Sequence, residues 1–337
     1  MNQKETEARK LVIQAAQRLV EEGLVARTWG NISARVSSTH FVITPSGRAY
    51  ETLAPDHLVL VRIDDCSYEG SITPSSEKGI HAAAYRHRPD AGIVIHTHQD
   101  YASCIGIDGN GMADLNDPIL GDFLPCAAYG LPGTKKLLRN VDSVMVKHPT
   151  CNAILMRHHG ALCMARDSDR AFEILQALED TSRAVFERAV TLPDIPANNA
   201  SELLAMLRSA DQQRYFAIEP HGAVLAVARQ GKTMRPHLDD LAQIAGTTIR
   251  CAKPDPDMVL KALKGRNAVL VDGVGAICCA EDESDVDAIA AIVRKGCMAT
   301  LYANTCGAAP LSRFDCALMR LVYTMKYAEK KQRPEPC

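Results

Sequence analysis

The stretch GIVIHTH at residues 92–98 decides the fold of the first half of this 337-residue chain. Its run of β-branched apolar residues after a glycine predicts a buried strand. Side chains at positions i and i+2 of a strand point to the same face of the sheet. The imidazoles of His96 and His98 can therefore converge on one metal ion, although a bare His-x-His pair is only moderately specific.

A second buried strand is predicted at residues 153–157, and it leads into His158-His159-Gly160. His159 supplies a plausible third ligand. Three protein ligands leave one coordination position open, which is the arrangement of catalytic zinc sites. His158 competes for the role, but adjacent strand residues face opposite sides, so only one of the two should bind. The same donors also accommodate Mn²⁺, Co²⁺ or Fe²⁺.

Two small-residue loops precede the histidines. Ser75-Ser76-Glu77 opens a predicted helix that runs to about residue 87, with a serine at its N-cap. A glutamate in a first helical turn ordinarily complements the helix dipole, and the N-terminus itself is a favourable anion site. The second loop, Thr-Pro-Ser-Gly at residues 44–47, is of the kind that exposes backbone amides to phosphate.

The first 190 residues alternate between the apolar periodicity of strands and that of helices. Strands are predicted at residues 41–44 and 58–63, and helices at residues 4–22 and 168–189. Residues 192–200 contain two prolines and two asparagines and are typical of a linker. We therefore expect one α/β domain over residues 1–195 and a second over residues 196–337.

The second domain contains a partial echo of the first. Residues 267–280 align without gaps on residues 152–165, and seven of these 14 positions are identical. In both segments an Asp-rich turn leads into a predicted helix, which favours an internal repeat. Val274 stands in the copy where His159 stands in the first domain.

A weaker match, of residues 236–238 to residues 55–58, places the start of the copy late in the chain. Too few residues then remain for counterparts of Glu77, His96 and His98. The second domain is accordingly predicted to be a smaller, degenerate and non-catalytic partial repeat of the same α/β type.

Composition excludes several classes of partner. The chain has 38 basic and 40 acidic residues, a net charge of -2 and no basic tract that would indicate nucleic-acid binding. Its N-terminus is polar, and no apolar stretch reaches the roughly 20 residues that a membrane helix needs. The 12 cysteines form no Cys-x-x-Cys pair. We expect free thiols, a cytoplasmic location and no membrane partner.

Residues 1 to about 190 resemble the class II aldolase/adducin family at the histidines, the glutamate and the loops described above. The matching stretches occur in the family's order and at similar spacings, which makes the resemblance specific. They are GNISAR (30–35), ITPSG (43–47), PSSE (74–77), HTH (96–98) and HG (159–160).

The resemblance implies a three-layer α/β/α domain in a homo-oligomer, expected to be a tetramer with active sites at subunit interfaces. His96, His98 and His159 would be the zinc ligands, and Glu77 the catalytic acid/base. The phosphate of a small-molecule substrate would be bound by five residues: Asn31, Ser46, Gly47, Ser75 and Ser76.

The implied activity is that of a lyase of carbohydrate metabolism, which cleaves a phosphorylated keto-sugar through a metal-chelated enediolate. Decarboxylation of a phosphorylated 3-keto acid could use the same site. Epimerisation through the same bond cleavage is a third and weaker alternative. A non-catalytic, adducin-like interaction protein is the alternative from a different class. The family aldolases use a tyrosine to protonate the leaving aldehyde oxygen, and residues 111–123 contain none. The substrate is therefore left open.

Overall fold

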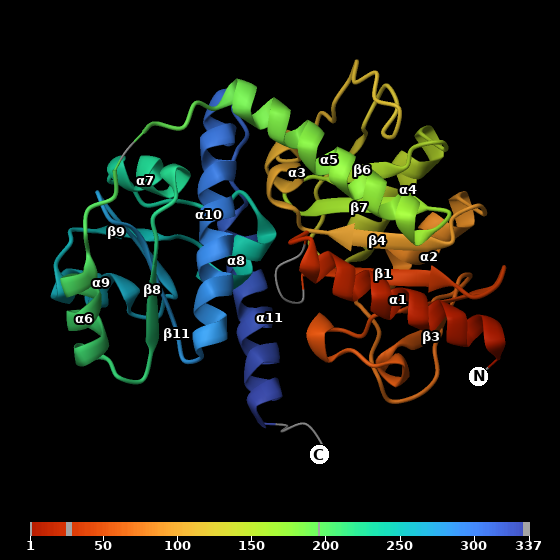
Figure 1. Cartoon of the computed structure of the whole chain (residues 1–337), viewed down its shortest axis with the longest axis horizontal. Helices are drawn as coiled ribbons and strands as arrows, with labels where there is room; N and C mark the ends of the chain where they lie inside the picture. The colour runs from red at the N-terminus through yellow and green to blue at the C-terminus, as the bar shows by residue number, and fades with distance from the viewer. Residues whose placement is uncertain (1, 25–28, 195, 333–337) are drawn as a thin grey trace. The chain divides into compact units, whose positions relative to one another are not determined.

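The structure, a computed structural model, describes residues 2–24, 29–194 and 196–332, with the backbone alone for residues 326–332. The chain divides into two units, Met1–Val185 and Phe186–Cys337 (Figure 1). In the part of the chain that is described, no helix is long and apolar enough to cross a membrane. All eleven cysteines described there are free thiols.

A seven-stranded sheet forms the centre of the first unit. Its strand order is β3-β2-β1-β4-β7-β6-β5, so the central strand β4 pairs antiparallel with both β1 and β7. The predicted strands are confirmed, with ends that differ by one or two residues. Their bounds are β1 (Gly30–Arg35), β2 (His40–Ile43), β3 (Val59–Arg62), β4 (Ile93–Thr97), β5 (Cys126–Ala127), β6 (Ala153–Met156) and β7 (Gly160–Ala165).

Helices cover both faces of this sheet. On one face, α2 and α4 pack onto Val94 and Leu162. On the other face, the Cys163 thiol donates to the Ala171 carbonyl of α5 at 3.6 Å. Arg18 of α1 lies over the Phe172 ring of α5, 4.0 Å from its centroid. The bounds are α1 (Gln3–Glu21), α2 (Lys78–His87), α3 (Asp100–Ile105), α4 (Lys135–Lys147) and α5 (Ser168–Ala189), with 3-10 turns at Tyr50–Thr52 and Pro55–His57.

The second unit contains a mixed four-stranded sheet of order β8-β11-β10-β9. Helices α6 and α9 contribute Leu207 and Val259 to the core on one face of this sheet. The bounds are β8 (Tyr215–Glu219), β9 (Arg250–Ala252), β10 (Ala268–Val271), β11 (Gly275–Ala280), α6 (Ser201–Ala210), α7 (Gly222–Arg229), α8 (Asp239–Ala245), α9 (Pro256–Leu263), α10 (Glu283–Cys306) and α11 (Arg313–Gln332).

The register of this sheet repeats that of β4-β7-β6-β5 in the first unit. Ala153 pairs with Cys163 in the β6–β7 hairpin, and Ala268 pairs with Cys278 in the β10–β11 hairpin. Each residue of the second pair lies 115 positions after its counterpart in the first pair (268 − 153 and 278 − 163). In each sheet a short parallel strand, β5 or β9, flanks the hairpin on one side.

On the other side of the hairpin, β8 takes the place of β4. His96 lies opposite Leu162 in the first sheet, and Ile218 lies opposite Ile277, the residue equivalent to Leu162, in the second. This strand lies before residue 236, outside the stretch in which the sequence left too few residues for counterparts of Glu77, His96 and His98. The positions that the strand register makes equivalent to His96, His98 and His159 are Ile218, Pro220 and Val274, whose side chains cannot bind a metal. The N-cap of α6, the helix before β8, is Ala200, where α2 has Glu77.

Candidate metal centre

Strand β4 and the turn after β6 bring three imidazoles together in the first unit. The ring centroids of His96, His98 and His159 lie 4.7 Å apart in each of the three pairs. One nitrogen from each ring lies within 4.8 Å of the others. All three side chains are buried, with exposed fractions of at most 8%. A buried cluster of this composition suggests a divalent metal ion.

The hydrogen bonding of His96 suits a metal ligand. Its Nδ1 lies 2.8 Å from the Ala161 carbonyl oxygen, and because a carbonyl can only accept, Nδ1 carries the proton. The lone pair of Nε2 therefore points toward His98, whose Nε2 is 2.9 Å away. Burial lowers the pKa of His96 well below its ordinary value. The ring is neutral, as metal binding requires.

Glu77 lies at the edge of this cluster. Helix α2 begins at Lys78, so Glu77 occupies the N-cap position and the expected serine cap is wrong. Its carboxylate makes no capping bond to the helix. Instead, Oε1 lies 3.0 Å from His159 Nε2 and Oε2 lies 3.4 Å from His96 Nε2. The break before the helix thus turns the carboxylate toward the imidazoles.

The surroundings of Glu77 favour its ionised form. Burial alone would raise the pKa of this carboxyl, but the hydrogen bond from His159 favours the ionised form and lowers it. Asn31 Nδ2 also donates to Oε2 at 2.9 Å. The net pKa lies well below the ordinary value, so a buried, hydrogen-bonded carboxylate faces the three histidines at neutral pH.

A buried hydrogen-bond network behind Asn31 was not predicted. His81 Nε2 bonds the Asn31 Oδ1, while His81 Nδ1 lies 2.6 Å from Ser33 Oγ. Ser33 Oγ lies in turn 2.9 Å from the Tyr85 hydroxyl. The sequence does contain a signal, because Glu77, His81 and Tyr85 are spaced four apart on one helix face. Asn31 and Ser33 likewise share one face of a strand.

The two loops predicted to bind phosphate run side by side. The Ser46 amide donates to the Thr73 carbonyl at 3.0 Å, and the Ser75 amide donates to the Thr44 carbonyl at 3.1 Å. Ser75 Oγ also accepts from the Glu77 amide at 3.2 Å. The structure therefore places both loops next to the catalytic carboxylate predicted from the sequence.

A third segment reaches the same loops and was not predicted. Gly133 has a φ of +72°, and a Cβ added there would lie 3.1 Å from both Cβ and Oγ of Ser76. The next residue, Thr134, caps helix α4 by accepting from the Leu137 amide. The N-terminus of α4 thus lies beside Ser76, although 57 residues separate Gly133 from Ser76 in the sequence (133 − 76).

His158 does not belong to the imidazole cluster. It lies in a turn rather than a strand, with a φ of 61°. Its ring packs edge-on against Tyr129, with the centroids 5.6 Å apart. The equivalent position in the second unit is Gly273, which adopts a similar φ of 73° without a Cβ penalty.

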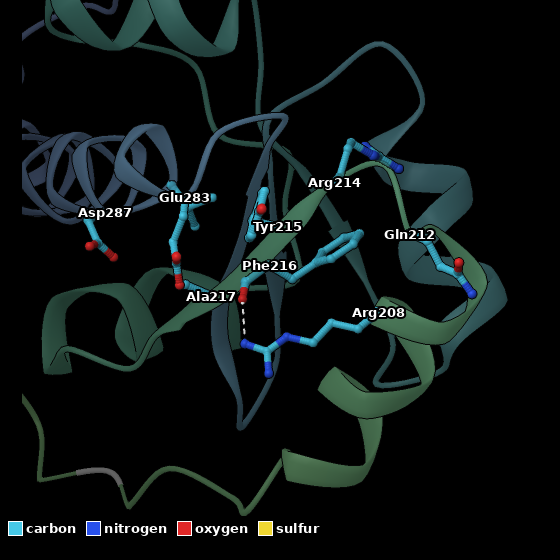
Figure 2. A pocket seen from close by; sticks show the side chains of 9 residues that line it. Arg208, Gln212, Arg214, Tyr215, Phe216, Ala217, Glu283 and Asp287 are labelled. Atoms are coloured by element: carbon cyan, nitrogen blue, oxygen red, sulfur yellow. Dashed lines mark hydrogen bonds between the residues drawn. The ribbon is translucent and has the colours of Figure 1, made fainter.

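The second unit has a pocket of a different kind, along β8 (Figure 2). The Arg208 guanidinium crosses it and donates to the Phe216 carbonyl at 3.1 Å. Within the described part of the chain, the group with metal-site geometry is the histidine cluster of the first unit. The residues that line the pocket include neither histidine nor cysteine: Arg208, Gln212, Arg214, Tyr215, Phe216, Ala217, Glu283, Val286 and Asp287.

Residues 10–186 match the Class II Aldolase and Adducin N-terminal domain, and the chain belongs to this family. L-fuculose phosphate aldolase of Escherichia coli strain K12 is 28% identical over 199 residues, which cover 58% of this chain and 90% of that protein. L-ribulose-5-phosphate 4-epimerase of Salmonella paratyphi B is 32% identical over 187 residues, 51% of this chain and 81% of that protein. A solved structure of L-fuculose 1-phosphate aldolase superimposes with a TM-score of 0.50 at 27% identity, covering 56% of this chain and 91% of its own.

Proposed function

We propose that this protein is a divalent-metal-dependent lyase of the aldolase type that cleaves a carbon–carbon bond in a phosphorylated keto-sugar. The observation that carries the proposal is the buried cluster of three histidines with an ionised carboxylate 3.0 Å from one of them. The names of the relatives support the substrate class, because L-fuculose phosphate and L-ribulose 5-phosphate are both phosphorylated sugars.

His96, His98 and His159 would hold the metal, with Zn²⁺ the best match to three imidazoles and Mn²⁺, Co²⁺ or Fe²⁺ compatible with them. When bound, the ion supplies Lewis-acid stabilisation of negative charge on the substrate's carbonyl and hydroxyl oxygens. The Ala161 carbonyl holds the His96 ring in the tautomer that presents Nε2.

Glu77 would move the proton. Cleavage removes a proton from the hydroxyl of the carbon that becomes an aldehyde, and adds a proton to the carbon of the phosphate-bearing fragment. A carboxylate that is ionised at the start and shielded from water can take up a proton and return it. The hydrogen bond from Asn31 keeps the carboxylate in place during both steps.

Ser46, Gly47, Ser75 and Ser76 would bind the substrate phosphate from the two neighbouring loops. Two of these residues, Ser46 and Ser76, are exposed to solvent. The N-terminus of α4 beside Ser76 adds a favourable potential for an anion. A phosphate fixed there would hold the bond to be cleaved next to Glu77.

The identity to an epimerase supports epimerisation as a second candidate, since the same bond could be broken and re-formed. Purified metal-loaded protein is incubated with phosphorylated ketoses and with a phosphorylated 3-keto acid, and aldehyde, carbon dioxide and epimer are measured. We expect aldehyde, and its loss in the isosteric variant Glu77→Gln at unchanged metal content. Carbon dioxide alone would replace the aldolase assignment by a decarboxylase, and epimer alone would replace it by an epimerase. No product with any substrate would favour an adducin-like interaction protein.

For the second unit, residues 196–337, we propose a degenerate copy without catalytic function. The three positions that correspond to the histidines carry Ile218, Pro220 and Val274, so this unit contributes no metal ion. Full-length protein should bind one metal ion per chain, and two would overturn this proposal. The tetramer and the cytoplasmic location stay predictions; sedimentation of the full chain tests the first.

A further inference from the structure

We propose that His81 is a positioning residue: it fixes the orientation of the Asn31 amide, which in turn holds the Glu77 carboxylate facing the metal ligands. The proposal rests on the proposed function of Glu77. It assigns a role to a buried histidine that neither binds the metal nor touches substrate.

The chemistry of the partners sets the direction of every hydrogen bond in the network. The Asn31 Oδ1 can only accept, so the proton of the neutral His81 ring resides on Nε2. His81 Nδ1 is then an acceptor, and the Ser33 hydroxyl donates to it at 2.6 Å. The lone pair left on Ser33 Oγ accepts from the Tyr85 hydroxyl at 2.9 Å. The donors thus run in one consistent order.

This order determines which way the Asn31 amide faces. With Oδ1 bound to His81, Nδ2 points at Glu77 and donates to its carboxylate at 2.9 Å. Rotating the amide by half a turn would set two acceptors against each other at the Glu77 carboxylate and, while the His81 ring keeps this tautomer, two donors against each other at His81. Both polar atoms of Asn31 are used inside the network, so we assign this residue to Glu77 rather than to the substrate phosphate.

The network is shielded from water and anchored on rigid elements. His81 and Ser33 are fully buried, and Asn31 is 6% exposed. Asn31 lies directly opposite the ligand His96 in the β1–β4 pairing, so the amide and the ligand share one backbone frame. Leaving the Asn31 Oδ1 without a donor would be costly in this interior.

The second unit gives an internal comparison. Ala200 is the N-cap of α6 as Glu77 is the N-cap of α2, so Leu204 corresponds to His81, four residues further along. Leu204 packs against the core of its own sheet. The same architecture therefore folds with an apolar residue at this position. The fold does not require the histidine, which is present in the unit that has the carboxylate.

The test compares His81→Leu, the residue of the second unit, with His81→Gln, whose amide can still donate to Asn31 Oδ1. We expect His81→Leu to lower kcat on the best phosphorylated ketose by about 10- to 100-fold with little change in KM and one metal ion per chain. His81→Gln should recover most of that loss. His87→Leu is the matched control on the same helix: His87 bonds Asp142 at 2.9 Å, away from the site, and kcat should not change.

A second measurement needs no turnover. In metal-free, ¹⁵N-labelled protein, the side-chain NH₂ signal of Asn31 should be downfield and slow to exchange, and should move toward a free amide in His81→Leu but not in His81→Gln. The positioning role would be refuted if the wild type is active and His81→Leu changes neither kcat nor the Asn31 signal. A wild type inactive on every substrate would refute the proposed function, and the amide signal would still decide the orientation of Asn31.

Discussion

Replacing Gly160 by alanine should weaken metal binding, because the added methyl group would push strands β4 and β7 apart next to the histidine cluster. Gly160 opens β7 directly after the proposed ligand His159, and a Cβ added there would lie 2.3 Å from the Thr97 carbonyl oxygen. Real Cβ atoms approach no closer than 3.0 Å, so β4 and β7 must separate by about 0.7 Å (3.0 − 2.3). Thr97 lies between the other two ligands, and the displacement therefore reaches the metal site.

The size of this shift sets the expected effect. Metal–ligand distances tolerate deviations of only about 0.2 Å, and overpacking typically costs about 1–3 kcal/mol of stability. We expect Gly160→Ala to lose about 10- to 100-fold in Zn²⁺ affinity, comparable with loss of a residue that supports a ligand. Competition with a chromophoric chelator on metal-stripped protein measures the affinity, and urea unfolding measures the stability.

Gly92→Ala is the matched control at the other end of the same two strands. Its Cβ would lie 2.2 Å from the Arg166 carbonyl oxygen, an equally severe backbone clash. This variant should lose similar stability and keep its Zn²⁺ affinity, because the ligands are remote from the clash. Equal affinity losses in the two variants, or none in Gly160→Ala, would refute the reasoning.

Three further predictions concern single side chains. His159→Asn should abolish stoichiometric metal binding and His158→Asn should retain it, since asparagine tolerates the left-handed conformation at 158; metal analysis after gel filtration measures both, and equal metal contents would contradict the assignment. Burial lowers the pKa of His81 from 6.5 to about 4. Between these two pH values the unfolded chain binds a proton at His81 that the folded chain does not bind. The free energy of unfolding is therefore highest above pH 6.5 and falls by about 3 kcal/mol toward pH 4. His81→Gln should flatten that part of a urea-unfolding pH profile, and an unchanged slope would disprove the shift. Lys295→Met would remove the ammonium that lies 2.5 Å from the buried Asp240 carboxylate, and should cost about 3–5 kcal/mol in the same unfolding assay; a loss below 1 kcal/mol would contradict this.

The strands of the first unit could be predicted because their apolar patterns are local. The apolar run at residues 92–98 predicted a strand, in which His96 and His98 at positions i and i+2 share one face, and the structure brings His159 to them. The helix start was mispredicted, because serine N-cap preference is a local rule. Here the Ser75 hydroxyl bonds the Glu77 amide, and the carboxylate turns to partners that are distant in sequence.

The extent of the repeat could not be predicted, because β8 shares almost no side chains with β4. Only the hydrogen-bonded register shows that Ile218 occupies the position of His96. The role of His81 was hidden for a related reason. Its spacing from Glu77 is visible in the sequence, but it acquires meaning only when β1 is known to bring Asn31 against α2.

The most direct test of the central claim is titration of metal-stripped, full-length protein with Zn²⁺, followed by X-ray absorption of the loaded sample. We predict one tight site per chain with three imidazole ligands at about 2.0–2.1 Å, absent from His96→Ala and His159→Ala. No tight site, two sites per chain, or a site that persists in both variants would contradict the account.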